Sequence, residues 1–221
     1  MPKRVHLVAQ IVPEKCTGCR LCEQVCPTVA IGMRPRRDDE PRPADTRARN
    51  IAVLEPEACY NAQACLEICP DDAIEMVELA EPMSVGFDLP EVDIEAVKAL
   101  CRKAGFGRTM PICICTNTSA GELATAILAG AHTPEAVSLA TGARTGCVEL
   151  CLQPILQLLT AAGHGDAPRN PKNGFQWYGE SATLWQHVQA DGTLPQDIVE
   201  HYPEYPLDKE FADMAKLKRK R

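Results

Sequence analysis

The stretch that decides the fold of the first part of the chain is CTGCRLCEQVCP, residues 16–27. Its first three cysteines follow the C-x-x-C-x-x-C spacing, which lets three thiolates hold one face of an iron-sulfur cube. The fourth cysteine follows three residues later and precedes a proline, and a cysteine in that position normally binds a second cluster. The stretch therefore predicts two cluster sites and a matching stretch elsewhere in the chain.

The matching stretch is CYNAQACLEICP, residues 59–70, and it differs from the first at one ligand position. Ala62 stands where the second cysteine is expected, and a methyl group cannot bind iron. Over residues 1–80 the chain resembles bacterial-type two-cluster ferredoxins, which implies a ferredoxin-like βαββαβ domain with crossed ligands. The resemblance assigns a [4Fe-4S] cluster to Cys16, Cys19, Cys22 and Cys69, and the second cluster to Cys26, Cys59 and Cys65.

Three thiolates are the ligand set that a [3Fe-4S] cluster requires, and we favour that interpretation of the second site. Two alternatives stay open. One is a [4Fe-4S] cluster whose odd iron takes water or a side chain such as Asn61, and the other is an empty, structural site. Zinc sites and disulfides also use paired cysteines, but neither explains a three-one-proline pattern that occurs twice. Because cluster type helps to set the potential, two unlike clusters would differ in potential.

A third candidate site is formed by Cys113 and Cys115 and, 31 residues later, by Cys147 and Cys151. Residues 110–162 resemble the [2Fe-2S] domain of bacterioferritin-associated ferredoxin, and the resemblance implies that these four cysteines bind a [2Fe-2S] cluster. A tetrahedral zinc in the same place is the alternative, since four thiolates suit both centres. Besides the cysteines, the resemblance rests on the segments GAHT (130–133), ATGA (140–143) and TGC (145–147), and on the apolar stretch after Cys151.

The last cysteine pair departs from that family, because three residues separate it where two are usual. A three-residue spacing also occurs in thioredoxin-like [2Fe-2S] ferredoxins, which place a strand before the third cysteine. Here the segment has helix signals instead: Ser119 can cap a helix over 120–129, and Thr133 followed by Pro134 begins a second helix that stops at Gly142. We therefore expect a small helical module.

The remaining segments are predicted to connect and extend these modules. Residues 81–109 form a linker and a helix over 92–104, in which the lone Cys101 is a small buried hydrophobe. Residues 33–50 form an exposed loop with six arginines, used for partner contact or merely tolerated. Residues 163–221 form an irregular, aromatic-rich extension with short helices over 181–189 and 195–201, which packs on its own chain or docks on another subunit.

Composition and motifs narrow the function. The net charge is −7, which argues against nucleic-acid binding, and no apolar run reaches the ~20 residues of a membrane span. The amino-terminal segment does not have the pattern of a secretory signal, so a cytoplasmic location is expected. No catalytic constellation or nucleotide fingerprint is present, so we do not expect an enzyme.

The sequence thus predicts an α+β electron-transfer protein or subunit that relays single electrons between redox partners. Its partners would be redox proteins, in the first place a flavin- or metal-containing subunit of a multisubunit oxidoreductase that holds the catalytic site. The alternative is an iron- or redox-sensing protein, or a partner in iron mobilisation, that uses a labile cluster.

Overall fold

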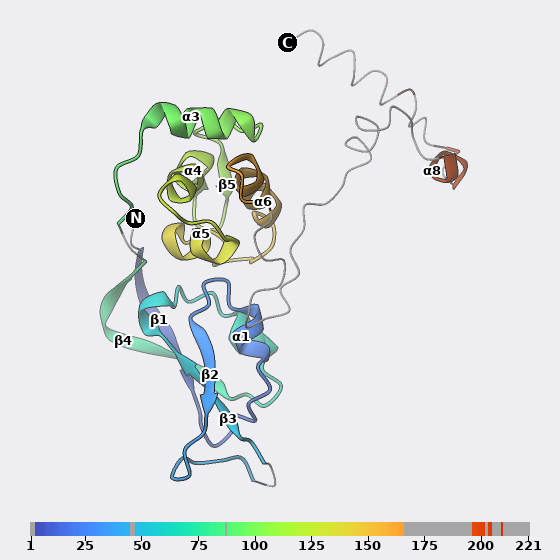
Figure 1. Cartoon of the computed structure of the whole chain (residues 1–221). Helices are drawn as coiled ribbons and strands as arrows, with labels where there is room; N and C mark the ends of the chain where they lie inside the picture. The colour runs from blue at the N-terminus through green and yellow to red at the C-terminus, as the bar shows by residue number, and fades with distance from the viewer. Residues whose placement is uncertain are drawn as a thin grey trace. The chain divides into compact units, whose positions relative to one another are not determined.

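The computed structural model describes residues 3–44, 47–86, 88–165, 196–201, 203–204 and 209. The chain divides into two units after Gly179, and each is treated by itself. The first unit contains both cysteine-rich regions (Figure 1).

The first cysteine-rich region has the element order β-α-β-β-α-β, with a 3₁₀ turn before its second helix. Its outer strands pair antiparallel along their length, from Lys3 opposite Val85 to Ile11 opposite Ile74, and its inner strands pair antiparallel as a hairpin. The result is two two-stranded ribbons with a short helix after the first strand of each half (Figure 1). The elements are β1 (Lys3–Ile11), α1 (Leu21–Val25), β2 (Ile31–Pro35), β3 (Asn50–Leu54), η1 (Pro56–Ala58), α2 (Ala64–Ile68) and β4 (Ile74–Val85).

The two halves of this region repeat the same unusual backbone. Arg20 and Gln63, which precede α1 and α2, both adopt the left-handed conformation, with φ of 71° and 61°. Gly18 and Asn61, two residues earlier, also have positive φ, at 76° and 56°. These turns direct each cysteine loop around a hollow, so the sequence repeat is also a structural repeat.

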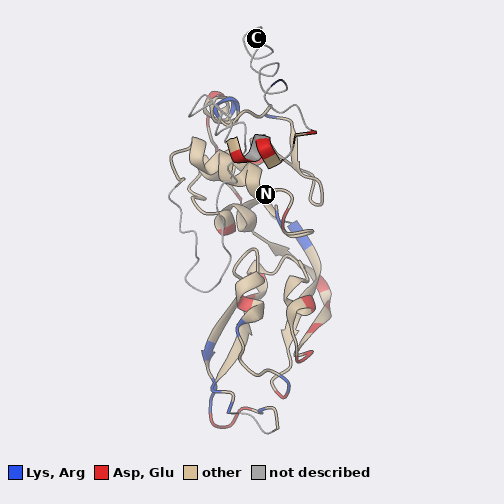
Figure 2. Ribbon diagram, turned by 90° about the vertical axis from the view of Figure 1, so that its right-hand side faces the viewer, with Lys and Arg blue, Asp and Glu red and all other residues tan. Residues whose placement is uncertain are grey.

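The connection between β2 and β3 corrects part of the loop prediction. Residues 33–35 belong to β2, and Arg36 is buried, so the exposed loop is shorter than the sequence indicated. The Arg36 guanidinium donates hydrogen bonds to the carbonyl oxygens of Cys16 (2.7 Å) and Pro13 (3.2 Å), and to that of Pro41. Charged residues gather at the tip of the hairpin, beyond this anchor (Figure 2).

The second cysteine-rich region is helical, as predicted. Ser119 forms a capping box with Glu122, Thr133 caps the next helix, and Gly142 ends that helix with φ of 74°. Residues 120–146 form two helices and turns, which is the arrangement of the helical module and not that of a thioredoxin-like domain. The elements are α3 (Ile94–Lys103), β5 (Pro111–Cys113), β6 (Thr118–Ser119), α4 (Ala120–Leu128), α5 (Pro134–Thr141) and α6 (Leu152–Ala161).

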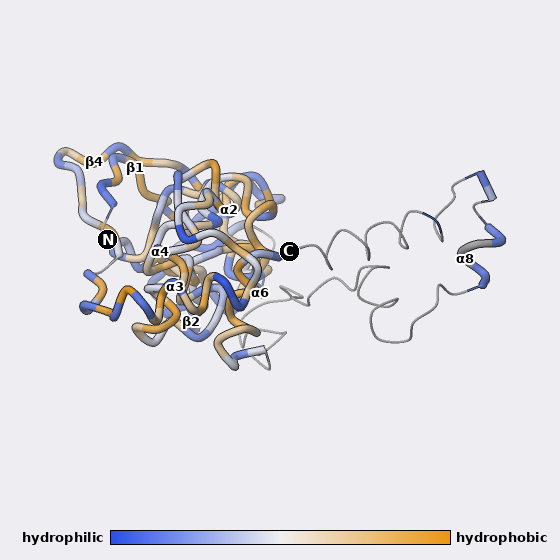
Figure 3. Tube along the Cα trace, turned by 90° about the horizontal axis from the view of Figure 1, so that it is seen from above, coloured by the Kyte–Doolittle hydropathy of each residue, from blue (hydrophilic) through white to orange (hydrophobic). Residues whose placement is uncertain are grey.

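The core of the helical region is built from small aliphatic side chains. Leu123, Ile155 and Leu158 are fully buried between α4 and α6. Cys101 of α3 is 1% exposed and belongs to the same core, which confirms its prediction as a buried hydrophobe. Hydrophobic and hydrophilic stretches alternate along these helices in Figure 3, as one-sided packing requires.

Two further observations concern the ends of the regions. β4 continues to Val85, past residue 80, so the connection to α3 begins at Gly86. The short helix α8 (Gln196–His201) matches the helix predicted over 195–201, whereas the helix over 181–189 and most of the aromatic-rich extension lie outside the described residues. None of the helices in the described ranges has the length and apolar character that a bilayer crossing requires.

Candidate iron-sulfur centres

The first candidate centre is an open pocket near the start of α1. Three of its cysteines come from the first loop and α1, and the fourth comes from the end of α2, in the other half of the repeat. The structure therefore brings together the four cysteines that the resemblance assigned to one cluster: Cys16, Cys19, Cys22 and Cys69.

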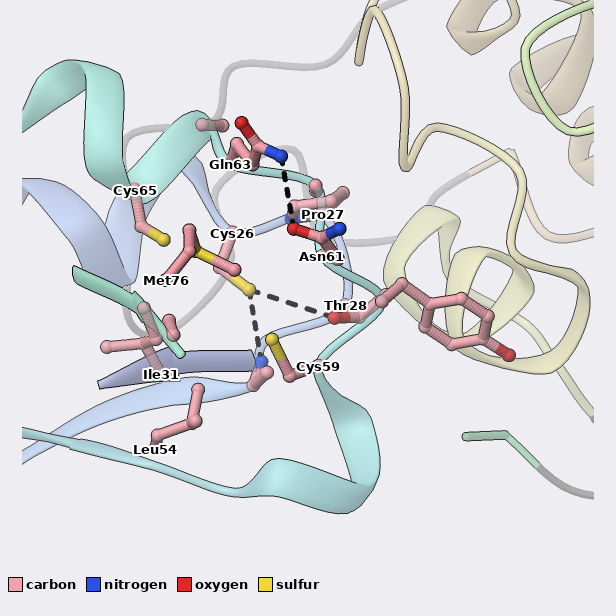
Figure 4. A pocket seen from close by; sticks show the side chains of 15 residues that line it. Cys26, Pro27, Thr28, Ile31, Leu54, Cys59, Asn61, Gln63, Cys65 and Met76 are labelled. Atoms are coloured by element: carbon pink, nitrogen blue, oxygen red, sulfur yellow. Dashed lines mark hydrogen bonds between the residues drawn. The ribbon is translucent and has the colours of Figure 1, made fainter. Parts of the chain in front are cut away.

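The second candidate centre is an open pocket near the start of α2 (Figure 4). Cys26, Cys59 and Cys65 line it, and Ala62 is part of the wall where a fourth thiolate is expected. This pocket and its four-cysteine counterpart are similar in size. Both leave space between their cysteines, as a bound cluster requires.

Backbone N–H groups point at equivalent sulfurs in the two halves. The N–H of Ala30 donates to Cys26 Sγ at 3.2 Å, and the N–H of Ala73 donates to Cys69 Sγ at 3.3 Å. Thr28 Oγ1 is also 3.7 Å from Cys26 Sγ. Hydrogen bonds to sulfur stabilise the more negative, reduced state of a cluster and so help to set its potential.

Burial makes free thiolates unfavourable at both centres. It raises the pKa of Cys22 to about 12 and the pKa of Cys65 to about 12, because desolvation disfavours the charged form. Bound iron reverses this balance, since a coordinating thiol is deprotonated outright. The buried cysteines therefore fit ligands of a positively charged metal centre.

The third candidate centre has its four cysteines arranged as two pairs. Cys151 donates a hydrogen bond to Cys113, and Cys115 donates one to Cys147. The hydrogen bond from Cys151, together with hydrogen bonds from Thr116, lowers the pKa of Cys113 to about 4. Two thiol pairs fit a [2Fe-2S] cluster, in which each iron takes two cysteine ligands.

One of these two pairs is buried and the other is exposed. Cys113 and Cys151 are buried, whereas Cys115 and Cys147 are exposed. Two large apolar side chains next to the ligands are also exposed, Ile114 at 81% and Leu150 at 78%. A cluster held here would have one edge in the protein and one edge at the surface.

The described residues bring no three His, Cys, Asp or Glu side chains together closely enough to hold a single metal ion. The cysteines instead surround hollows in the first region and form separate pairs in the second. A tetrahedral zinc site needs four ligands within about 2.3 Å of one point.

Sequence reasoning missed three residues that shape these centres. Arg36 binds the carbonyl of the ligand Cys16, and the backbone N–H of Arg144 donates to Cys113 and Cys151. Tyr60, next to the ligand Cys59, is buried and hydrogen-bonded to α5. Of the three, only Tyr60 could have been noticed from the sequence, because an aromatic residue stands where the first half has Thr17.

Comparison with known protein families identifies both regions. A 4Fe-4S dicluster domain matches residues 15–73, and a BFD-like [2Fe-2S] binding domain matches residues 111–161. No curated protein and no solved structure matched the chain. The two resemblances stated from the sequence are confirmed as a fusion, so the chain binds [4Fe-4S] and [2Fe-2S] clusters and has an iron-sulfur electron-transfer role.

Proposed function

We propose that this chain is an electron-transfer subunit of a multisubunit oxidoreductase, in which a flavin- or metal-containing subunit carries out the catalysis. The observation that carries the proposal is the placement of three cysteine-lined centres in one unit, with exposed ligands at two of them. Cys19 is exposed at the first centre, and Cys115 and Cys147 are exposed at the third. An electron can therefore enter at one region and leave at the other.

The ligand sets of the proposal follow the cavities and pairs described above. The first centre takes a [4Fe-4S] cluster, the second a [3Fe-4S] cluster and the third a [2Fe-2S] cluster. When bound, these clusters supply one-electron redox chemistry. Their ligands are Cys16, Cys19, Cys22 and Cys69; Cys26, Cys59 and Cys65; and Cys113, Cys115, Cys147 and Cys151.

The protein's own residues hold and insulate the centres. Ile31, Leu54 and Met76 line the second cavity and exclude water from it (Figure 4). Ile11 and Ile74 do the same at the first cavity. All twelve cysteines are free of disulfides, which fits a reducing compartment, and we place the protein in the cytoplasm.

The proposal is tested by a redox titration of anaerobically purified protein, followed by EPR spectroscopy. We expect three signals, one for each centre, that appear and disappear reversibly over repeated cycles while the iron content stays constant. Loss of iron in each cycle would contradict the proposal, because a relay must keep its clusters.

The second candidate function is iron or redox sensing, and one observation favours it. With Ala62 in place of a fourth cysteine, the second centre has one protein ligand fewer than the first. A fourth, corner iron there would therefore be bound less firmly than at the first centre. Adding Fe²⁺ under reducing conditions distinguishes the two functions. A sensor should bind and release one iron atom as the Fe²⁺ concentration varies within its physiological range. The iron content of an electron relay should stay constant.

A further inference from the structure

Tyr60 connects the second cluster site to the helical region. Its hydroxyl donates to the carbonyl oxygen of Leu139 at 2.7 Å, and the carbonyl oxygen of Val85 lies 3.2 Å from the same hydroxyl. Leu139 is in the last turn of α5, where carbonyl oxygens lack partners within the helix. A side chain of the ferredoxin region therefore caps a helix of the [2Fe-2S] region.

Two glycines leave room for the Tyr60 ring. A Cβ on Gly142 would lie 3.0 Å from Tyr60 Cε1, and a Cβ on Gly86 would lie 2.2 Å from its hydroxyl oxygen. Both glycines have positive φ, 74° and 88°, which side chains other than glycine rarely adopt. Tyr60 is 8% exposed, so the contact is closed to water.

A second bridge joins the same two regions near the third centre. Lys3 Nζ, at the start of β1, donates to the carbonyl oxygen of Thr116 at 3.1 Å. Thr116 in turn hydrogen-bonds to the ligand Cys113. The two bridges hold the [2Fe-2S] region against the ferredoxin region at separate points.

We propose that Tyr60 is a positioning residue that makes the second cluster, held by Cys26, Cys59 and Cys65, the direct electron partner of the [2Fe-2S] cluster. The route starts at Cys59 and its neighbour Tyr60. It crosses the hydrogen bond to α5 and reaches Arg144, whose backbone N–H donates to Cys113.

The equivalent residue in the first half makes no such crossing. Thr17, next to Cys16, is hydrogen-bonded through its hydroxyl to Asp71 of its own region at 2.6 Å. The order of transfer is therefore first cluster, second cluster, [2Fe-2S] cluster, or the reverse. One electron moves in each step, so that one centre is oxidised and the next is reduced, and no bond or proton is exchanged.

This inference rests on the proposed function and is tested with Tyr60→Phe and Tyr60→Ala in the full chain. In wild-type protein reduced with dithionite, the EPR signal of the reduced [2Fe-2S] centre should be split by the paramagnetic, reduced second centre. We expect Tyr60→Ala to lose this splitting and to slow intramolecular electron transfer after photoreduction, while the [2Fe-2S] signal of the reduced protein and the [3Fe-4S] signal of the oxidised protein are both kept. Thr17→Val is the matched control and should leave the splitting and the rate unchanged.

Backbone amide hydrogen exchange gives an independent measurement on Tyr60→Phe, a variant that keeps the aromatic ring and removes only the hydroxyl. Loss of one hydrogen bond of about 1 kcal/mol should raise exchange at the carboxyl end of α5 about fivefold. The inference is overturned if wild type shows no splitting, if Tyr60→Ala leaves the splitting and the rate unchanged, or if Tyr60→Phe leaves the exchange unchanged. Any of these outcomes, in a protein whose three centres still cycle reversibly, would overturn this inference but leave the proposed function intact.

Discussion

The two cysteine loops of the ferredoxin region have the same backbone conformation. They differ in two side chains that bear on which cluster each loop binds and which region it contacts. Both loops reach their helix through left-handed residues, and both direct an N–H at the sulfur of the crossed ligand. The first has Cys19 where the second has Ala62, and Thr17 where the second has Tyr60. If the proposed clusters are bound, the two loops show how a repeated backbone can hold two unlike redox centres through a few side-chain differences.

Removing one of the crossed ligands should abolish a whole cluster signal. Cys69 lies in the second sequence stretch but lines the first cavity, and Cys26 lies in the first stretch but lines the second cavity. Cys69→Ala should therefore weaken or abolish the EPR signal of the [4Fe-4S] centre and spare the three-cysteine centre. Cys26→Ala should do the opposite.

The control for this pair is Cys101→Ala, which removes a buried cysteine that lines neither cavity and should leave all three signals in place. If Cys69→Ala affected the second centre instead, each stretch would bind its own cluster and the crossed arrangement would be wrong.

The next effect comes from making the two loops alike. Ala62→Cys restores the missing thiolate in the wall of the second cavity, so a [3Fe-4S] centre should become a [4Fe-4S] centre. We expect the iron content to rise by about one atom per chain, with loss of the oxidised [3Fe-4S] EPR signal.

Gln63→Cys is the matched control, because it adds a thiol to the same cavity one residue away from the ligand spacing. An unchanged iron content in Ala62→Cys would count against the ligand assignment at this centre, and so would an equal gain in Gln63→Cys.

The smallest effect concerns the loop backbone. A Cβ on Gly18 would lie 2.6 Å from the carbonyl oxygen of Asn50, at a φ of 76°. Gly18→Ala should therefore lower the free energy of unfolding by about 2 kcal/mol. Asn61, its counterpart, already carries a side chain at a φ of 56°, so Asn61→Ala should cost about 1 kcal/mol or less.

Guanidinium unfolding under anaerobic conditions, followed by cluster absorbance, measures both variants. Equal losses in the two variants would show that the close approach of Asn50 does not distinguish the two loops.

Local sequence signals predicted most of the ligands and the helices. The cysteine spacings led to the first two cavities, and the caps at Ser119, Thr133 and Gly142 match the observed ends of α4 and α5. These features could be predicted because ligand spacing and helix capping depend on residues only a few positions apart.

Long-range contacts could not be predicted in this way. Arg36 lies among six arginines in a stretch that has no hydrophobic period, yet it is buried against the carbonyl of Cys16. Tyr60 finds its acceptor 79 positions away, at the end of a helix in another region. Such pairings depend on how the regions pack, and a single sequence has no periodic pattern that encodes them.

We propose that one chain holds three different iron-sulfur centres and passes electrons through them. The most direct test is the iron and acid-labile sulfide content of anaerobically purified protein. We predict about nine iron and ten sulfide atoms per chain, from clusters of four, three and two irons. Colourless protein that contains zinc and no sulfide would contradict the claim.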